Sequence, residues 1–227
     1  MNNIKKIFNN LKLDLANSKL KGKITTSLAG IDVVITGKDA VGNMLEEWFF
    51  KWATLNGHKL EKTNKSQKFP DYFVPEDSGN KGLLDIKSFN IKENPAFDMA
   101  DAYAFLEMLL NDISKIDANY IIFGYSLDDK GNLIIENIWC KKIWEAVGKS
   151  KKNHITCQIR TPKGKDHSEG RLQKIRPYHF HKSRSKKNQF NTLLEFLETL
   201  QKLLDYNKGT KSIYSDWLTK IKEILPP

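Results

Sequence analysis

The chain has 227 residues, of which 40% are hydrophobic and 11% aromatic, which is enough apolar material to bury a core and excludes a disordered polymer. Its formal net charge of +10 favours a polyanionic partner, usually a nucleic acid. No apolar run has transmembrane length or the compact form of a signal peptide, and two cysteines, Cys140 and Cys157, do not indicate a disulfide framework. We therefore expect a cytoplasmic protein.

The first two thirds of the chain predict strands mixed with helices. Apolar residues recur at three- and four-residue steps after a helical N-terminus, which predicts helices at 39–57 and 96–113. Runs of strand-forming residues between turn formers predict a strand or hairpin at 24–37 and strands at 58–63, 71–74, 83–89, 119–127 and 132–139. The turn-rich residues 75–82 indicate that 71–74 and 83–89 form a hairpin.

The last third adds smaller elements and ends in helices. A short helix is expected at about 141–148, strands at 155–160 and 171–176, and amphipathic helices at roughly 189–206 and 211–225. We find no internal repeat and no linker long enough to separate domains. The pattern predicts one domain over 1–227, with a mixed α/β sheet flanked by helices and a helical C-terminal addition.

The predicted hairpin carries acids where buried strands are expected. Asp71 begins one strand, Asp85 lies within the next, and Lys87 projects from the same face as Asp85 because side chains alternate along a strand. Converging carboxylates repel each other unless a cation lies between them, and their oxygens suit a hard divalent ion, above all Mg²⁺. A nearby ammonium can orient water or stabilise charge on a phosphate. On a basic protein, this pattern indicates phosphodiester hydrolysis.

The residues Pro70-Asp71 and Asp85-Ile86-Lys87 resemble the PD-(D/E)XK nuclease motif, in the setting typical of type II restriction endonucleases. The predicted order within 39–127 resembles the catalytic core of that family, which is a helix, three strands, a helix and a strand. Residues of about 141–227 would then supply DNA recognition and helical elements. The resemblance covers about 90 residues, and the motif gains specificity from its strand–turn–strand setting.

The resemblance implies a role for each residue of the motif. Asp71 and Asp85 would bind the metal, and the backbone carbonyl of Ile86 would add a ligand. Lys87 would lie beside the attacking water. No cofactor other than Mg²⁺ is expected.

An acid on the preceding helix often supports the metal in this family, and both Glu46 and Glu47 are available. We slightly prefer Glu47, which is flanked by apolar residues, whereas Glu46 shares a helix face with Gly42 and Phe49. The alternative is that both are solvated helix charges.

Positive charge is concentrated in residues 141–188, which hold fifteen Lys or Arg and three acids. Side chains on the two strands here can reach base edges, and we expect this of Gln158, Arg160, Arg171, Gln173 and Lys174. Basic residues farther along are expected to contact phosphates, which give affinity without sequence information, namely Lys182, Arg184, Lys186 and Lys187. The alternative for any single residue is a solvated loop face.

These features predict a Mg²⁺-dependent, site-specific endonuclease acting on double-stranded DNA. Cutting both strands of a short site calls for a homodimer in which each subunit cuts one strand. The family also implies a cognate DNA methyltransferase as a genetic partner. Two alternatives remain open, a structure-specific repair or junction-resolving nuclease of the same superfamily and a basic DNA-binding protein without catalysis.

Overall fold

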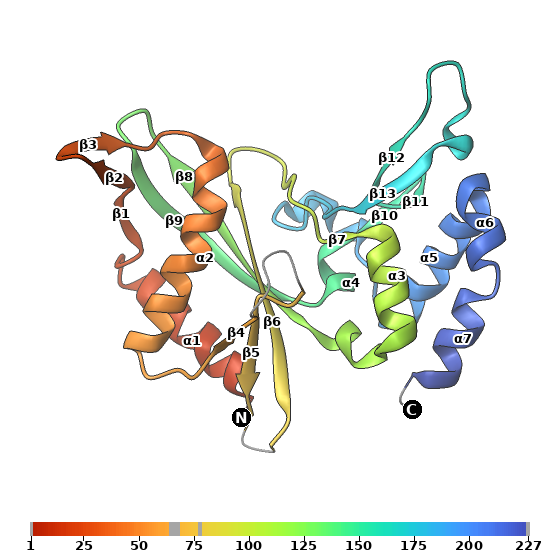
Figure 1. Cartoon of the computed structure of the whole chain (residues 1–227), viewed down its shortest axis with the longest axis horizontal. Coiled ribbons are helices and arrows are strands. Elements are labelled where there is room, and N and C mark those ends of the chain that lie inside the picture. Colours follow the sequence, from red (N-terminus) through yellow and green to blue (C-terminus); the bar gives the residue numbers. More distant parts are fainter. Residues whose placement is uncertain (1, 64–68, 77–78, 226–227) are drawn as a thin grey trace. The chain divides into compact units, whose positions relative to one another are not determined.

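A computed structural model describes residues 2–63, 69–76 and 79–225 of the chain. Contacts divide the described chain into two compact units (Figure 1), made of residues 1–95 with 118–141 and of residues 96–117 with 142–227. This is a finer division than the single domain predicted from the sequence. The predicted core of 39–127 is shared between the units, because residues 96–117 belong to the second.

The first unit is built on a mixed sheet with the strand order β1-β9-β8-β6-β5-β4. Strands β6 and β8 are parallel, and their other neighbours in this order are antiparallel. The mixed α/β class and the antiparallel hairpin of β5 and β6 are thus confirmed. The strands are β1 (Lys21–Lys23), β4 (Glu61–Lys62), β5 (Tyr72–Pro75), β6 (Lys81–Asn90), β8 (Asn119–Leu127) and β9 (Asn132–Lys141).

Helices α1 (Asn3–Ala16) and α2 (Lys38–Leu55) pack on one face of this sheet. Their apolar stripes share a buried cluster with alternate residues of the central strands, such as Leu84 and Ile86 of β6. The indole of Trp52 on α2 also donates to Asp14 of α1 at 2.9 Å. Because strand side chains alternate, the residues of β6 between these apolar ones face the other side of the sheet.

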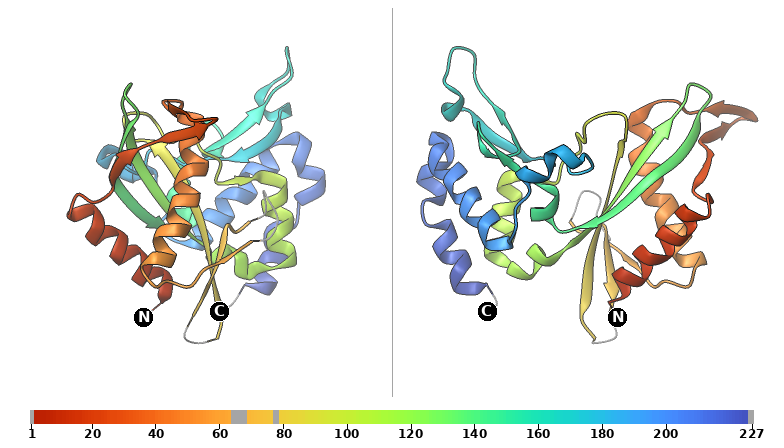
Figure 2. Two further views of the ribbon diagram at one scale, coloured as in Figure 1. Left: turned by 60° about the vertical axis from the view of Figure 1, so that its left-hand side comes forward. Right: turned by 180° about the vertical axis from the view of Figure 1, so that it is seen from behind.

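A separate hairpin of β2 (Thr25–Leu28) and β3 (Ile31–Val34) projects from the first unit. It lies beside the turn between β8 and β9 in the views of Figures 1 and 2, where the N–H of Ile24 donates to the carbonyl of Gly131 at 3.4 Å. Every residue of the two strands is exposed to solvent. The hairpin therefore contributes little to the core of its own unit.

The second unit combines short strands with helices. Strands β12, β13 and β7 pair in that order, and β10 pairs with β11. The bounds are β7 (Ala100–Asp101), α3 (Ala102–Asn111), η1 (Ile113–Asp117), α4 (Ile143–Ala146), β10 (Lys149–Ser150), β11 (His154–Ile155), β12 (Cys157–Arg160), η2 (His167–Glu169), β13 (Arg171–Ile175), η3 (Ser183–Asn188), α5 (Leu193–Tyr206), α6 (Lys208–Tyr214) and α7 (Trp217–Ile224).

Two predicted helices differ from the structure. The helix expected at 96–113 begins only at Ala102, because Asp101 caps it by accepting from the N–H of Ala104 at 3.1 Å. The residues before it pair with β13 instead, as in the bond from Met99 N–H to Ile175 O at 3.0 Å.

In the described part of the chain, no helix has the length and apolar character needed to cross a membrane.

The helix expected at 211–225 is broken into α6 and α7. The amide of Gln201 on α5 donates to the carbonyl of Tyr214 at 3.1 Å and accepts from the N–H of Leu218 at 2.9 Å. One buried side chain thus satisfies the end of one helix and the start of the next. The predicted continuous helix was wrong because periodicity does not register a partner on another helix.

Candidate active site

The acids of the β5–β6 hairpin meet where β5 begins. Tyr72 pairs with Leu84 as the first residue of β5, and Asp71 immediately precedes it. The side chain of Asp71 continues the pairing, because its Oδ2 accepts from the backbone N–H of Ile86 at 2.7 Å. In an extended strand the N–H and C=O of one residue point to the same side. The carbonyl of Ile86 therefore faces the side of β6 on which Asp71 lies.

Asp85 and Lys87 form an ion pair on the sheet face opposite α2, in which Asp85 is buried and Lys87 is half-buried. The residue Asp85 is only 3% exposed, and its Oδ2 lies 2.6 Å from Nζ of Lys87. Among the described residues, this oxygen receives no well-aligned hydrogen bond. The residue that pairs with Asp85 in register on β8 is the buried Tyr120. The ammonium thus supplies the counter-charge without which a buried carboxylate is costly.

Burial and mutual charge control ionisation in this cluster. Burial raises the pKa of Asp71 to about 7, and the charge of Asp85 acts in the same direction, against the lowering effects of Lys87 and of the Ile86 N–H. Burial lowers the pKa of Lys87, but the charges of Asp85 and Asp71 outweigh it, so that the net pKa is raised. Lys87 is therefore an ammonium at neutral pH and acts as a cation and hydrogen-bond donor.

Glu46, and not Glu47, is the helix acid near this cluster. The hydroxyl of Tyr72 donates to the carbonyl of Glu46 at 3.0 Å, which ties that turn of α2 to the start of β5. Burial raises the pKa of Glu46, which also responds to the charges of Lys62, Glu47, Lys87 and Asp85.

The side chain of Glu47 is 66% exposed and pairs with Lys62. The location of these two side chains therefore favours Glu46 over the predicted Glu47 as the acid that supports a metal, and this role is taken up below as a proposal. Gly42 was the available signal: a Cβ there would lie 3.8 Å from Ser88 on β6, and Glu46 follows Gly42 by one helical turn.

The donor set suits a hard divalent ion. Within residues 2–63, 69–76 and 79–225, no group of three or more His, Cys, Asp or Glu side chains is arranged to hold a metal. Mg²⁺ does not require such a group, because it is bound through one or two carboxylates and keeps several waters. Asp71 is bonded to the backbone of Ile86 and is affected by the charge of Asp85, so two carboxylates and the Ile86 carbonyl are available as oxygen donors near each other, and the residues present fit the ion.

The residues predicted to reach bases lie on the sheet of the second unit. In register, Gln158 of β12 faces Lys174 of β13, and Arg160 faces Arg171. Gln158, Arg160 and Arg171 are exposed, and the guanidinium of Arg171 lies 5.5 Å from the ring centroid of Tyr103. A bulge next to Ile159 shifts the register of this pair of strands.

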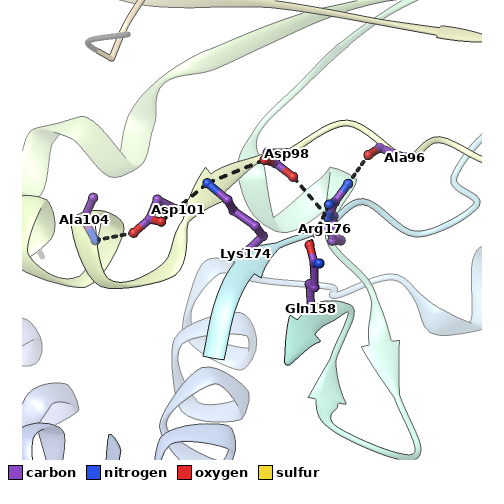
Figure 3. Close-up of polar contacts among 7 residues, drawn as sticks. All are labelled: Ala96, Asp98, Asp101, Ala104, Gln158, Lys174 and Arg176. Atoms are coloured by element: carbon purple, nitrogen blue, oxygen red, sulfur yellow. Dashed lines mark hydrogen bonds and ion pairs between the residues drawn. The ribbon is translucent and has the colours of Figure 1, made fainter. Parts of the chain in front are cut away.

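Two basic residues of this surface form ion pairs with acids that the sequence did not predict to lie there. Lys174 pairs with Asp98 at 3.6 Å and with Asp101 at 3.4 Å, and Arg176 pairs with Asp98 at 3.1 Å (Figure 3). Arg176 was itself omitted, although it follows Lys174 by two positions and so shares its side of an extended chain. The residues predicted to contact phosphates gather in or just before η3, where Arg184, Lys186 and Lys187 are exposed and Lys182 is half-buried.

The hairpin with its paired acids and lysine, on a mixed sheet covered by helices, defines a nuclease of the PD-(D/E)XK type. Comparison with known proteins gives the family. The sequence model described as NgoBV restriction endonuclease matches residues 1–225, and the chain belongs to that family. It is a site-specific type II DNA endonuclease, and the repair-nuclease and non-catalytic alternatives are set aside.

Individual relatives agree with this assignment. The type II restriction enzyme NlaIV of Neisseria lactamica is 30% identical over 204 residues, which cover 89% of this chain and 80% of that protein. The type II restriction enzyme NgoBV of Neisseria gonorrhoeae is 32% identical over 125 residues, covering 55% and 70% respectively. A solved structure of the NlaIV restriction endonuclease matches with a TM-score of 0.83 and 28% identity, over 96% of this chain and 86% of that one.

The pKa of Asp71 predicts a stabilising substitution in the metal-free protein. The unfolded chain releases this proton near the ordinary pKa of 3.8, whereas the folded protein releases it near 7. The contribution of Asp71 to stability is therefore present at low pH and lost as the pH rises towards 7. Asp71→Asn, which can still accept from Ile86, should be more stable than the wild type at pH 8 by on the order of 2 kcal/mol and should show a smaller gain at pH 5.

Urea unfolding in EDTA at the two pH values measures this difference. Asp129→Asn, which changes an exposed carboxyl in the β8–β9 turn, is the control and should follow the wild type. A gain for Asp71→Asn that is equal at both pH values would contradict the assigned cause.

Proposed function

We propose that this restriction endonuclease hydrolyses the phosphodiester bonds of double-stranded DNA with Mg²⁺ held by Asp71, Asp85 and the carbonyl of Ile86. The observation that carries the proposal is the ion pair of the buried Asp85 with Lys87, whose charged atoms lie 2.6 Å apart. It lies next to a second carboxylate, which is fixed by the backbone of the same strand. Such an arrangement is costly for folding and is typical of a site selected for chemistry.

When bound, the ion would supply Lewis-acid stabilisation of the charge that develops on the phosphate. Lys87 donates hydrogen bonds to the attacking water or to a phosphate oxygen, and it is held for this by Asp85. Asp71 keeps the carbonyl of Ile86 and its own carboxylate on one side of β6. Glu46 adds negative charge from α2, which favours a cation at the same point and supports it from outside the ligand set.

The surface of β12 and β13 and the cations around η3 are proposed to contact DNA. Their exposure supports this role, as does the concentration of basic residues in this part of the chain. A restriction enzyme acts on incoming DNA, so we place the protein in the cytoplasm with a cognate DNA methyltransferase that protects the host.

The exposed β2–β3 hairpin supports a homodimer. Large apolar side chains gather there, including Leu28 at 81% and Ile31 at 66% exposure, with Val33 and Val34 beside them. Contiguous exposed apolar side chains of this kind mark association surfaces, and a hairpin outside the main sheet gains stability from a partner. A twofold dimer would present one active site to each DNA strand.

The catalytic pair can be tested by neutral substitutions. Lys87→Met and Asp85→Asn should each lower the cleavage of phage DNA in Mg²⁺ by roughly 10²–10³-fold, because each removes transition-state stabilisation. Lys87→Met also leaves the buried charge of Asp85 unpaired, at a cost of about 3–5 kcal/mol. Asp85→Asn should cost less, because Lys87 is half-buried and still faces the charge of Asp71.

The double variant Asp85→Asn/Lys87→Met therefore separates folding from catalysis. It should recover most of the thermal stability lost by the single variants and remain inactive. Full cleavage by a folded double variant would disprove the assignment, and cleavage by the wild type in excess EDTA would disprove the need for a divalent ion.

The two helix acids give a matched comparison. Glu46→Gln should lower metal-dependent cleavage by about tenfold and raise the Mg²⁺ concentration needed for half-maximal rate, because it removes a supporting charge. Glu47→Gln changes the same group one residue away, on the exposed side of α2, and should retain the wild-type rate and Mg²⁺ requirement. Steady-state rates across a Mg²⁺ titration decide between them, and the reverse order of effects would favour Glu47.

The dimer proposal predicts that charge on the hairpin separates the subunits. Leu28→Asp/Ile31→Asp should shift the sedimentation-equilibrium mass from a dimer to a monomer at micromolar concentration, because it places carboxylates in an apolar contact. Leu13→Asp changes a single apolar residue of α1 that is 61% exposed and should leave the dimer intact. A doubly substituted hairpin that still dimerises would show that the interface lies elsewhere.

A further inference from the structure

The guanidinium of Arg176 is held at each of its nitrogens (Figure 3). Nε forms an ion pair with Asp98 Oδ1 at 3.1 Å. One terminal amino group donates to the carbonyl of Ala96, and the other donates to Oε1 of Gln158 at 2.7 Å. A planar cation with partners on these sides has a fixed position and orientation.

This contact also fixes the side-chain amide of Gln158. An amide oxygen and nitrogen have nearly the same shape, and their assignment depends on their partners. Arginine has donors and no acceptor, so the atom of Gln158 that faces Arg176 must be the oxygen. The amide nitrogen, with its N–H donors, is then the other end of a side chain exposed on β12.

A glutamine held in this way differs from a free one in which base it can recognise. A free glutamine pairs with adenine by accepting from N6 and donating to N7. With its oxygen engaged by Arg176, Gln158 offers chiefly donors. Guanine presents two acceptors, N7 and O6, on its major-groove edge, whereas adenine presents one acceptor and one donor.

We propose that Gln158 is a specificity-determining residue that selects guanine in the major groove, and that Arg176 is the positioning residue that holds it in the donor orientation. The proposal rests on the proposed DNA contact of β12 and β13 and deepens it by naming the base. Asp98 and Ala96 act one step further away, by fixing Arg176.

The competing explanation is that the contacts of Arg176 only join residues 96–101 to the sheet of β12 and β13. That junction already has the bond from Met99 N–H to Ile175 O and the ion pairs of Lys174. A purely structural role therefore predicts that substitutions at Gln158 leave sequence choice unchanged, which an experiment can detect.

The test is cleavage of a pool of double-stranded DNA with randomised sequence in Mg²⁺, followed by sequencing of the ends. Gln158→Glu still accepts from Arg176 but presents oxygen instead of N–H groups to the base. We expect one G·C pair of the wild-type site to lose discrimination against the other bases by roughly tenfold or more. Gln158→Ala adds no charge and should relax the same base pair.

Arg176→Lys and Asn9→Asp complete the set. Arg176→Lys keeps the charge but lacks the rigid planar fork that holds Ala96, Asp98 and Gln158 in fixed directions, and it should relax the same G·C pair. Asn9→Asp makes the same amide-to-acid change on an exposed part of α1 and should retain the wild-type site. Melting temperatures of all variants distinguish unfolding from altered choice.

The inference is overturned if both Gln158 variants cut the wild-type site with unchanged discrimination, or if the relaxed pair is A·T. It is also overturned if Arg176→Lys lowers only the melting temperature. A wild type that cuts without any preferred sequence, or not at all, instead contradicts the proposed function. The two failures are therefore distinguishable.

Discussion

The alternation of side chains along β6 is the constraint on which the candidate active site depends. This strand is paired with β5 on one side and with β8 on the other, so it cannot slip without exposing the core residues Leu84 and Ile86. The same register places Asp85 and Lys87 on the opposite face. The positions of the proposed catalytic residues are thus fixed by the apolar residues between them, so that the same strand register determines both the core and the candidate site.

Two contacts extend this order beyond β6. The bond from Ile86 N–H to Asp71 brings an acid from a neighbouring strand to the site. The bond from the Tyr72 hydroxyl to Glu46 O brings a turn of α2, and stacking of Phe50 on Tyr72 at 5.8 Å supports it. Asp71 and Tyr72 are consecutive, so one short segment positions acids from both the sheet and the helix.

The sequence alone predicted the parts of this protein that depend on local pattern. Strand β8 was expected at 119–127 and lies there, because an apolar run between turn formers leaves little choice. The acidic hairpin was predicted for the same reason, because turn formers separate its two strands. The spacing of Asp71, Asp85 and Lys87 then indicated a metal-binding site. The confirmed fold and family follow from these features, while the individual catalytic roles remain proposals.

The errors fell where a partner distant in sequence decides the outcome. The helix predicted from residue 96 begins only at Ala102, because residues 99–101 pair with β13 and Asp101 then caps the helix start. Gln201 divides another predicted helix from across the unit. Glu46 and Glu47 are adjacent on one helix, and what distinguishes them lies on other elements: Ser88 of β6 lies opposite Gly42, one turn before Glu46, and Lys62 pairs with Glu47. The role proposed for Arg176 depends on its contacts with Ala96, Asp98 and Gln158. No sequence motif connects these residues.

The acids beside the basic surface have a consequence for the search along DNA. Asp98 and Asp101 neutralise part of the charge of Lys174 and Arg176, so fewer cations remain to displace counterions from an arbitrary duplex. Binding to non-cognate DNA is weakened with each cation removed in this way, since that binding is almost wholly electrostatic. If DNA contacts this surface as proposed, the enzyme would spend less time bound to the many non-cognate sequences of a genome, and weak binding to them would contribute to its selectivity.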